Sequence, residues 1–337
     1  MLYDLRLDLD TRCNLQCVYC DNRDIPSERK ASLDLSSFEP LLPAINSNCW
    51  SVYLSCGGEP TLHPQFRTLL EQLRTQLTRP DISMVTNGIL LNDANRNALL
   101  ASPVNRILVS IDSHDADLFA RLCGTKPEIA EKIFTNLEQF ALERMHHPKP
   151  LHLIVTAIAM KSTLAGLPEL AKWLRTLHVS AFNVQWLNPL EYTEMRQEVL
   201  DPHSFEVRST LLEIQKILKG SDVLLDWPRD RSWDKIKSVW ANRILFRNRF
   251  AYLQNAVRKV LGPRLGMPCV HANNTFYLDP NGEFNMCPHR AIPLEFPRSG
   301  AQMTTQMRSI FKLIRTKRPD CCNKCQEHYN ILPITSK

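Results

Sequence analysis

Three cysteines near the start of the chain constrain its fold and chemistry more than any other feature. Cys13, Cys17 and Cys20 come directly after residues 4–9, where leucines alternate with charged residues. This period of two is typical of a half-buried strand, so we expect a strand that leads into a loop with three thiols. Neighbouring thiols outside disulfides usually bind a metal ion or a cluster. Four thiolates would complete a zinc or iron–sulfur site, whereas three leave one position open for a substrate or cofactor.

The overall composition is that of a folded protein that is not exported. A length of 337 residues with 44% hydrophobic residues allows one large domain with a smaller one, or two domains. No apolar run is long enough to cross a membrane, and the first residues lack the apolar core of a signal peptide. The eleven cysteines therefore favour metal or cluster binding over disulfides, and we expect a cytoplasmic protein.

Positive charge is concentrated in one segment. Residues 226–265 contain ten basic and three acidic residues, a net charge of +7, so the rest of the chain sums to about −1. Aromatic residues are interleaved with these charges. A packed segment with a solvated basic face is the simplest interpretation, and a lid over an anionic substrate or a helix on a membrane surface are alternatives. Nucleic-acid binding is the least supported, because no recognised binding motif accompanies the segment.

Apolar stretches alternate with amphipathic stretches along the first two thirds of the chain. The expected strands are residues 4–9, Trp50–Ser55, Ile82–Val85, Ile107–Ile111, Leu151–Ala159 and Ala181–Trp186. Helices are expected between them, including Pro64–Leu77 and Leu164–Leu177, and Ser36 with Glu39 looks like a helix-capping pair. Such alternation predicts a parallel sheet, whose ligands bind at the carboxyl ends of the strands.

The spacing Cys13-x3-Cys17-x2-Cys20, with Tyr19 before the last cysteine, resembles the signature of radical S-adenosylmethionine (SAM) enzymes. The resemblance implies a partial (β/α)6 barrel in which these cysteines hold a [4Fe–4S] cluster. It further implies that SAM chelates the fourth iron. Reductive cleavage of SAM then gives a 5′-deoxyadenosyl radical, which takes a hydrogen atom from the substrate. From spacing alone, the alternative is a zinc site completed by a distant ligand.

Three strand ends resemble the SAM-binding elements of that family. Gly57-Gly58-Glu59 follows the second strand; glycines permit close backbone approach, and the resemblance implies that this motif binds the amino group of SAM. Thr86-Asn87-Gly88, a turn by composition, is similar to a further family element near SAM. For Ser110 and Asp112 the resemblance implies hydrogen bonds to ribose hydroxyls. Ser113 stands where the family usually has a glycine.

The last third of the chain carries a second group of cysteines. Cys269 and Cys287 bracket a hairpin-like stretch with a Pro-Asn-Gly turn, and Cys322-x-x-Cys325 follows an expected helix, residues 304–315. Alone, these four thiols are also compatible with a zinc ribbon. Attached to such a barrel, they resemble the twitch form of the SPASM extension, which implies one auxiliary [4Fe–4S] cluster. Cys321 could replace Cys322 as a ligand.

Two residues after the fourth strand have more open roles. Arg121 could pair with the carboxylate of SAM, because a guanidinium suits a carboxylate fork; a solvated surface arginine is the alternative. Cys123 is not required by either cluster. In some radical SAM epimerases a lone cysteine gives a hydrogen atom to the substrate radical, and Cys123 is the candidate here. A buried thiol that acts only as a small hydrophobe is the alternative.

These features divide the chain into a radical SAM-like barrel (residues 1–221), a basic connecting segment (222–265) and a twitch- or SPASM-like extension (266–337). We predict a radical SAM oxidoreductase or modifying enzyme whose hydrogen abstraction leads to oxidation, epimerisation or bond formation on a peptide or sugar-type substrate. An external reductant such as flavodoxin or ferredoxin would supply electrons. Because the chain begins at a barrel strand, leader-dependent peptides are slightly disfavoured. The alternative from another class is a non-catalytic zinc or iron–sulfur nucleic-acid-binding protein.

Overall fold

The computed structural model describes residues 3–54, 57–187, 193–227, 243–245, 253, 275–285, 293–295 and 297–316. Most of the basic segment lies outside this range. Five of the cysteines considered above also lie outside it: Cys269, Cys287, Cys321, Cys322 and Cys325. The roles predicted for them therefore stay predictions.

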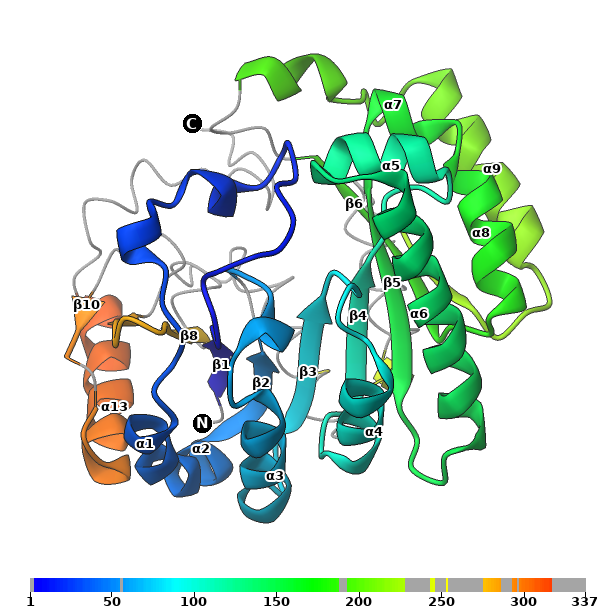
Figure 1. Ribbon diagram of the computed structural model, residues 1–337. Helices are drawn as coiled ribbons and strands as arrows, with labels where there is room; N and C mark the ends of the chain where they lie inside the picture. The colour runs from blue at the N-terminus through cyan, green and yellow to red at the C-terminus, as the bar shows by residue number, and fades with distance from the viewer. Residues whose placement is uncertain are drawn as a thin grey trace.

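A single sheet, ten-stranded over the described residues, forms the centre of the molecule in the order β10-β9-β8-β1-β2-β3-β4-β5-β6-β7 (Figure 1). Its middle consists of six parallel strands: β1 (Tyr3–Leu7), β2 (Cys49–Leu54), β3 (Asp81–Thr86), β4 (Arg106–Ser110), β5 (His152–Ala159) and β6 (Ala181–Trp186). Helices lie between consecutive strands, which is the pattern of a (β/α) barrel. The predicted partial (β/α)6 barrel is therefore confirmed.

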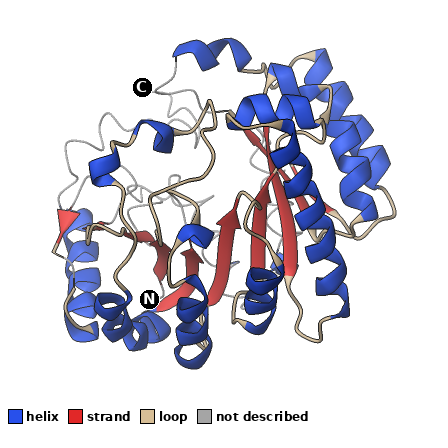
Figure 2. Cartoon of the chain, in the orientation of Figure 1, coloured by secondary structure: helices blue, strands red, loops and turns tan. Residues whose placement is uncertain are grey.

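Helices cover the outer face of this sheet (Figure 2). They are α1 (Leu35–Phe38), α2 (Leu42–Asn48), α3 (Phe66–Gln76), α4 (Asp93–Ala101), α5 (Ala116–Cys123), α6 (Pro127–His146), α7 (Lys161–Leu164), α8 (Leu167–Thr176) and α9 (Phe205–Leu218). In α3, Phe66, Leu69, Leu70 and Leu73 are all buried, because an amphipathic helix turns one apolar face to the core. Among the described helices, none is both long enough and apolar enough to cross a membrane.

The predicted capping pair of Ser36 and Glu39 is wrong. Asp34 caps α1 instead: its carboxylate accepts bonds from the Ser36 N–H at 3.1 Å and from the hydroxyls of Ser36 and Ser37 at 2.7 Å each. A carboxylate has two oxygens and can accept all three bonds, so it satisfies the start of this helix. The bonds from Ser37 and Ser36 lower the pKa of Asp34 to about 2.

The predicted C-terminal hairpin and helix are present, and they are continuous with the barrel. The hairpin is formed by β8 (Thr275–Leu278) and β9 (Phe284–Asn285), and β8 pairs in parallel with β1. A short β10 (Pro293–Leu294) pairs with β9, and α13 (Gly300–Thr316) packs beside α2. At the other edge, β7 (Leu224–Asp226) pairs with β6 beyond the predicted boundary at residue 221. The sheet thus joins parts of all three predicted segments.

The two faces of the barrel sheet differ in chemistry. Leu5 and Leu7 of β1 point to the helix layer and are fully buried, whereas Asp4 and Arg6, which alternate with them, point to the inside of the barrel. A cavity of about 240 Å³ occupies this interior. We call it the chamber. It is lined by Asp4, Arg6, Trp50, Ser51, Tyr53, Ser83, Arg106, Leu108, Ile154, Ala181, Asn183, Asp226 and Leu245.

Candidate functional site

The loop after β1 presents the partly exposed thiols of Cys13, Cys17 and Cys20, which form no disulfide. The loop is fixed to the end of α5 by two backbone bonds. The Gln16 N–H donates to the Cys123 carbonyl at 3.0 Å, and the Val18 N–H donates to the Leu122 carbonyl at 2.9 Å. The three thiols therefore project from a segment whose backbone is held in place.

Gly124, which ends α5, makes this attachment possible. Its φ of +62° lies in the left-handed region, and a Cβ there would be 2.6 Å from the Gln16 carbonyl oxygen. Only glycine fits such a close approach without strain. The cysteine loop and the C-terminus of α5 thus pack backbone against backbone.

Hydrogen bonds reach the sulfurs of Cys13 and Cys17. The Asn87 amide donates to Cys13 Sγ at 3.7 Å and to Asn14 Oδ1 at 2.7 Å. A hydrogen bond from Cys123 lowers the pKa of the Cys17 thiol, whereas burial raises the pKa of Cys13. Three thiols in one loop, with hydrogen bonds to the sulfurs of Cys13 and Cys17, match the ligands of an iron–sulfur cluster, whose potential depends on such bonds.

The fit to a cluster rests on this donor set. In the described part of the chain, no three Cys, His, Asp or Glu side chains form a group that could hold a single metal ion. The fourth position of a [4Fe–4S] cluster would be left to a ligand from outside the loop, as the count of three thiols predicts.

Gly57 and Gly58 lie directly on the end of the first strand. A Cβ on Gly58 would be 2.2 Å from the Asp10 carbonyl oxygen, so no side chain fits there. The Gly57 N–H donates to Asp8 Oδ1 at 2.9 Å, and the Glu59 N–H donates to the Arg12 carbonyl at 2.8 Å. The glycine pair therefore serves the close packing of two neighbouring strand ends.

The Glu59 side chain is buried and holds the third strand end in place. One carboxylate oxygen accepts from the Thr61 hydroxyl at 2.5 Å and from the Thr86 hydroxyl at 2.8 Å, and the other accepts from the Asn87 N–H at 2.7 Å. Burial raises the pKa of Glu59, and these bonds oppose the rise. Both oxygens are thus engaged within the protein. A role of the Glu59 side chain toward an amino group stays a prediction.

Asp112 lies just beyond β4 and is joined to the cysteine loop. It accepts a short hydrogen bond from the Tyr19 hydroxyl and a second bond, at 2.8 Å, from the Ile158 N–H. Burial raises the pKa of Asp112 to about 6. Ser110, two residues earlier, lies on the same face of β4 as Arg106 and Leu108, so it faces the barrel interior.

The remaining two predicted residues, Arg121 and Cys123, have different surroundings. Arg121 is exposed on α5, and its guanidinium makes no ion pair with another described residue. Cys123, two residues later, is 2% exposed and contacts Cys17. Its thiol therefore faces the cysteine loop, and its role as a hydrogen-atom donor stays a prediction.

The predicted residues that meet define the rim of the barrel: the Cys13–Cys20 loop, Gly57–Glu59, Thr86–Gly88 and Ser110–Asp112. Two further polar residues at the rim were not predicted, Asp8 and Asn22. The signal for Asp8 was present, because it continues the alternation of inward-facing residues along the first strand. Asn22 follows the cysteine motif and carries no recognisable pattern.

The chamber lies inside the barrel, from the middle of the strands to their amino ends, because Trp50, Arg106 and Ala181 of its lining stand at or next to the first residues of β2, β4 and β6. Arg6 and Ser83 point into it, and Arg6 precedes the rim residue Asp8 by two positions, about 7 Å along a strand. Leu245 closes the chamber from the side of β4, where the Arg106 guanidinium donates to the Leu245 carbonyl at 3.3 Å. Leu245 comes from the basic segment, so part of that segment has a packing role at the barrel.

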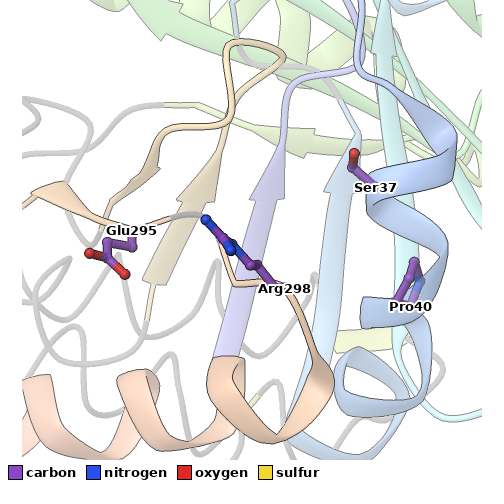
Figure 3. A pocket seen from close by; sticks show the side chains of 4 residues that line it. All are labelled: Ser37, Pro40, Glu295 and Arg298. Carbon is purple, nitrogen blue, oxygen red and sulfur yellow. The ribbon is translucent and has the colours of Figure 1, made fainter.

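A larger cavity, of about 630 Å³, lies away from the rim (Figure 3). Ser37 and Pro40 face it from α1 and the following turn, and Glu295 and Arg298 face it from the segment that leads into α13. The described lining includes no strand-end motif. We therefore place the site at the rim and the chamber, where the strand-end motifs and the charged lining residues lie, and not at the larger cavity.

Comparison with curated relatives gives partial matches. The chain is 34% identical to GTP 3′,8-cyclase of Nostoc punctiforme over 126 residues, 36% of this chain and 38% of that one. It is 28% identical over 220 residues to the tungsten-containing aldehyde ferredoxin oxidoreductase cofactor-modifying protein of Pyrococcus furiosus, 63% of this chain and 59% of that one. The match thus spans less than two thirds of the length of these relatives.

Solved structures share the fold over nearly the whole chain. Streptococcus suis SuiB bound to S-adenosylmethionine matches with a TM-score of 0.67 at 15% identity, covering 98% of this chain and 72% of that one. The protein anSMEcpe with bound AdoMet matches with a TM-score of 0.62 at 15% identity, covering 98% and 84%. At this identity the matches show a common fold.

A family model settles the class of protein. The model of the Radical SAM superfamily matches residues 10–179, which include the cysteine loop and all the strand-end motifs of the rim. The family accounts for these motifs, which a non-catalytic nucleic-acid-binding protein would leave without a role. The chain belongs to the radical SAM superfamily.

Proposed function

We propose that the chain is a radical SAM enzyme whose rim binds SAM and a [4Fe–4S] cluster and whose chamber receives a polar part of the substrate. The observation that carries the proposal is the meeting of the cysteine loop with the family motifs at the carboxyl ends of neighbouring strands, in the barrel that encloses the chamber. When bound, the cluster and SAM supply the 5′-deoxyadenosyl radical. The protein then determines which C–H bond meets that radical.

The rim residues have distinct tasks in this proposal. Cys13, Cys17 and Cys20 hold the cluster, and the amide of Asn87 donates to the Cys13 sulfur. Asp112 and Ser110 are suited to bind the ribose, because a carboxylate and a hydroxyl at the top of β4 can accept and donate hydrogen bonds. Glu59 positions the rim by linking the second and third strand ends.

The chamber determines the kind of substrate. Its described lining carries two arginines, Arg6 and Arg106, and the carboxylates Asp4 and Asp226. A volume of about 240 Å³ is below the roughly 300–1,000 Å³ of pockets that enclose a whole small ligand. The chamber therefore suits one polar group of a larger molecule, such as a side chain of a peptide.

A peptide substrate also agrees with the fold neighbours, since SuiB has been solved with its precursor peptide SuiA. A purine nucleotide is the second candidate, because several relatives are GTP 3′,8-cyclases. That similarity spans 36% of this chain for the Nostoc protein and 68%, at 25% identity, for the probable GTP 3′,8-cyclase of Methanosarcina acetivorans. The outcome of hydrogen abstraction, whether oxidation, epimerisation or bond formation, depends on the substrate.

The reconstituted enzyme tests this choice. With SAM and dithionite, wild-type protein is mixed with a peptide library or with GTP, and 5′-deoxyadenosine is measured. We expect a peptide to raise deoxyadenosine formation and, when deuterated, to pass deuterium into it. Stimulation by GTP with deuterium transfer from the nucleotide would reverse the assignment. A variant without Cys13, Cys17 and Cys20 gives the background.

The proposal includes one auxiliary [4Fe–4S] cluster on Cys269, Cys287, Cys322 and Cys325, with an external reductant such as flavodoxin or ferredoxin. Its support is the spacing of these thiols around the hairpin β8–β9. Each cluster contributes about four irons, so reconstituted wild type is expected to hold about eight per chain. Replacing Cys322 and Cys325 by alanine should leave about four, with SAM cleavage retained. Unchanged iron content would remove the auxiliary cluster from the proposal.

A further inference from the structure

Asn22 carries an unsatisfied hydrogen-bonding group at the rim. It lies two residues after Cys20, in the 3-10 helix η1 (Asp21–Asp24), and is 7% exposed. Its side-chain amide donates a short hydrogen bond to the Gly57 carbonyl. Its other polar atom, Oδ1, is buried and has no hydrogen-bond partner among the residues that the structure describes.

The orientation of this amide follows from its neighbour. If the side chain were turned over, Oδ1 would face the Gly57 carbonyl oxygen, and two acceptors would be in contact. The oxygen must therefore point away from Gly57. An acceptor buried without a donor destabilises the fold, so such atoms in folded proteins usually have a partner. Here the partner has to come from outside the described chain.

The surroundings of Gly57 favour a positively charged donor. Asp8 lies on the other side of Gly57, where its Oδ1 accepts from the Gly57 N–H and its Oδ2 is 2.9 Å from the place of a Gly57 Cβ. Two basic side chains nearby are engaged elsewhere: Arg12 pairs with Asp10 at 2.6 Å, and Arg23 with Glu194 at 3.0 Å. A carboxylate and an amide oxygen thus flank one glycine.

We propose that Asn22 is a SAM-binding residue whose Oδ1 accepts a hydrogen bond from the ammonium group of the cofactor. The NH2 group of the same side chain donates to the Gly57 carbonyl. One residue therefore holds Gly57 in place and binds the ammonium group of the ligand. The proposal rests on the proposed function, because it requires SAM at the rim. It assigns the recognition of the ammonium to a side chain on the cysteine loop, while Glu59 positions the rim.

A cycle of protein and ligand changes tests the assignment. Wild type, Asn22→Leu and the matched control Asn97→Leu, an exposed position on α4, are reconstituted with iron and sulfide. Without reductant, the dissociation constants of SAM and of its 2-oxo analogue, which lacks the ammonium, are measured by equilibrium dialysis. Iron content and chemical unfolding show whether each variant is folded and loaded.

We expect Asn22→Leu to weaken SAM binding by about 10- to 100-fold, because a hydrogen bond to a charged group contributes about 1.5–3 kcal/mol. Binding of the 2-oxo analogue should change less than about threefold, and Asn97→Leu should leave both constants unchanged. Equal weakening of both ligands would overturn the proposal, since Asn22 would then act only through Gly57. No binding of SAM by loaded wild type would instead contradict the proposed function.

If Asn22→Leu fails to load, Asn22→Asp gives a second measurement. Aspartate keeps an acceptor toward the ammonium and loses the donor toward Gly57. A preference for SAM over the 2-oxo analogue that is at least that of wild type would support the proposal. Loss of that preference would overturn it.

Discussion

The rim and the chamber are both polar, yet they are stabilised in different ways. At the rim, the buried carboxylates of Glu59 and Asp112 accept hydrogen bonds from the N–H groups of Asn87 and Ile158, which belong to other strand ends. In the chamber wall, charged side chains meet each other or a ring. Arg106 lies 3.9 Å from Asp81, and the Arg6 guanidinium lies 4.0 Å from the centre of the Tyr53 ring.

In the proposed function the rim binds the cofactor and the chamber receives the substrate. The difference in their contacts indicates that one region can change without the other. Main-chain donors are fixed by the sheet, so the rim geometry depends on the fold and on a few residues that permit close contact. Pairs of side chains can be exchanged without moving a strand. We therefore expect changes at the rim to affect cofactor binding and stability, and changes in the chamber to affect the substrate.

The largest effect is expected at Gly58. In Gly58→Ala the new Cβ would be 2.2 Å from the Asp10 carbonyl oxygen, and the next two nearest atoms, in Arg12 and Thr11, are also backbone. The strand ends must move apart, at a cost of about 3 kcal/mol or more in unfolding free energy, and SAM binding should be lost. Chemical denaturation and equilibrium dialysis measure both. Gly166→Ala, where the nearest atom is 3.5 Å away, is the control, and equal losses in the two variants would refute the explanation.

Asp112 makes the rim sensitive to pH. Its pKa is raised by burial from 3.8 to about 6, so between pH 4 and 6 the folded state binds more protons than the unfolded state. The unfolding free energy therefore falls as pH rises through this window, by about 3 kcal/mol in total at about 1.4 kcal/mol per pKa unit. Asp112→Asn should flatten the profile measured by urea unfolding of the apo-protein from pH 4 to 7. Parallel profiles for the two proteins would contradict this.

Leu245 tests the chamber side of the comparison. Leu245→Ala removes a side chain that is 5% exposed, and a cost of about 2 kcal/mol is expected for the enlarged chamber. SAM affinity should stay within about twofold, whereas the size of substrate group that supports turnover should increase. Dialysis with SAM and a competition assay with peptides of graded side-chain length check the two parts. A parallel fall in SAM affinity would mean that rim and chamber are not separate.

The smallest effect is expected at Cys123, whose thiol donates to Cys17. Loss of this hydrogen bond in Cys123→Ala should lower the reduction potential of the cluster by an amount on the order of tens of mV, because hydrogen bonds to the sulfurs stabilise the reduced state. Cys123→Ser should retain most of the wild-type value. Potentiometric titration followed by electron paramagnetic resonance gives both values. Identical potentials in all three proteins would leave Cys123 with a packing role.

The parts of the structure that the sequence predicts are those with a local signal. The six barrel strands follow from apolar runs, and the rim motifs follow each strand directly in the chain. The contact of Asn22 with Gly57 joins residues 35 positions apart, so no local sequence pattern predicts it. The chamber draws its lining from seven strands and from Leu245, so its composition depends on registers that alternation alone does not fix. The capping prediction failed because Ser36 and Asp34 are both good cap residues, and only the geometry of the turn distinguishes them.

The pairing of β8 with β1 has a consequence for how the protein is made. The first strand of the barrel has β2 on one side, and its other side is completed by Thr275–Leu278. At a synthesis rate of about 5–20 residues per second, the ribosome needs on the order of ten seconds or more to reach that partner. During this time the strand that leads into the cysteine loop has an open edge, which can pair with other chains. During synthesis there is thus an interval in which the edge of β1 is unpaired. A chaperone or the cluster-assembly machinery would have access to the cysteine loop in this interval, before β8 pairs with β1.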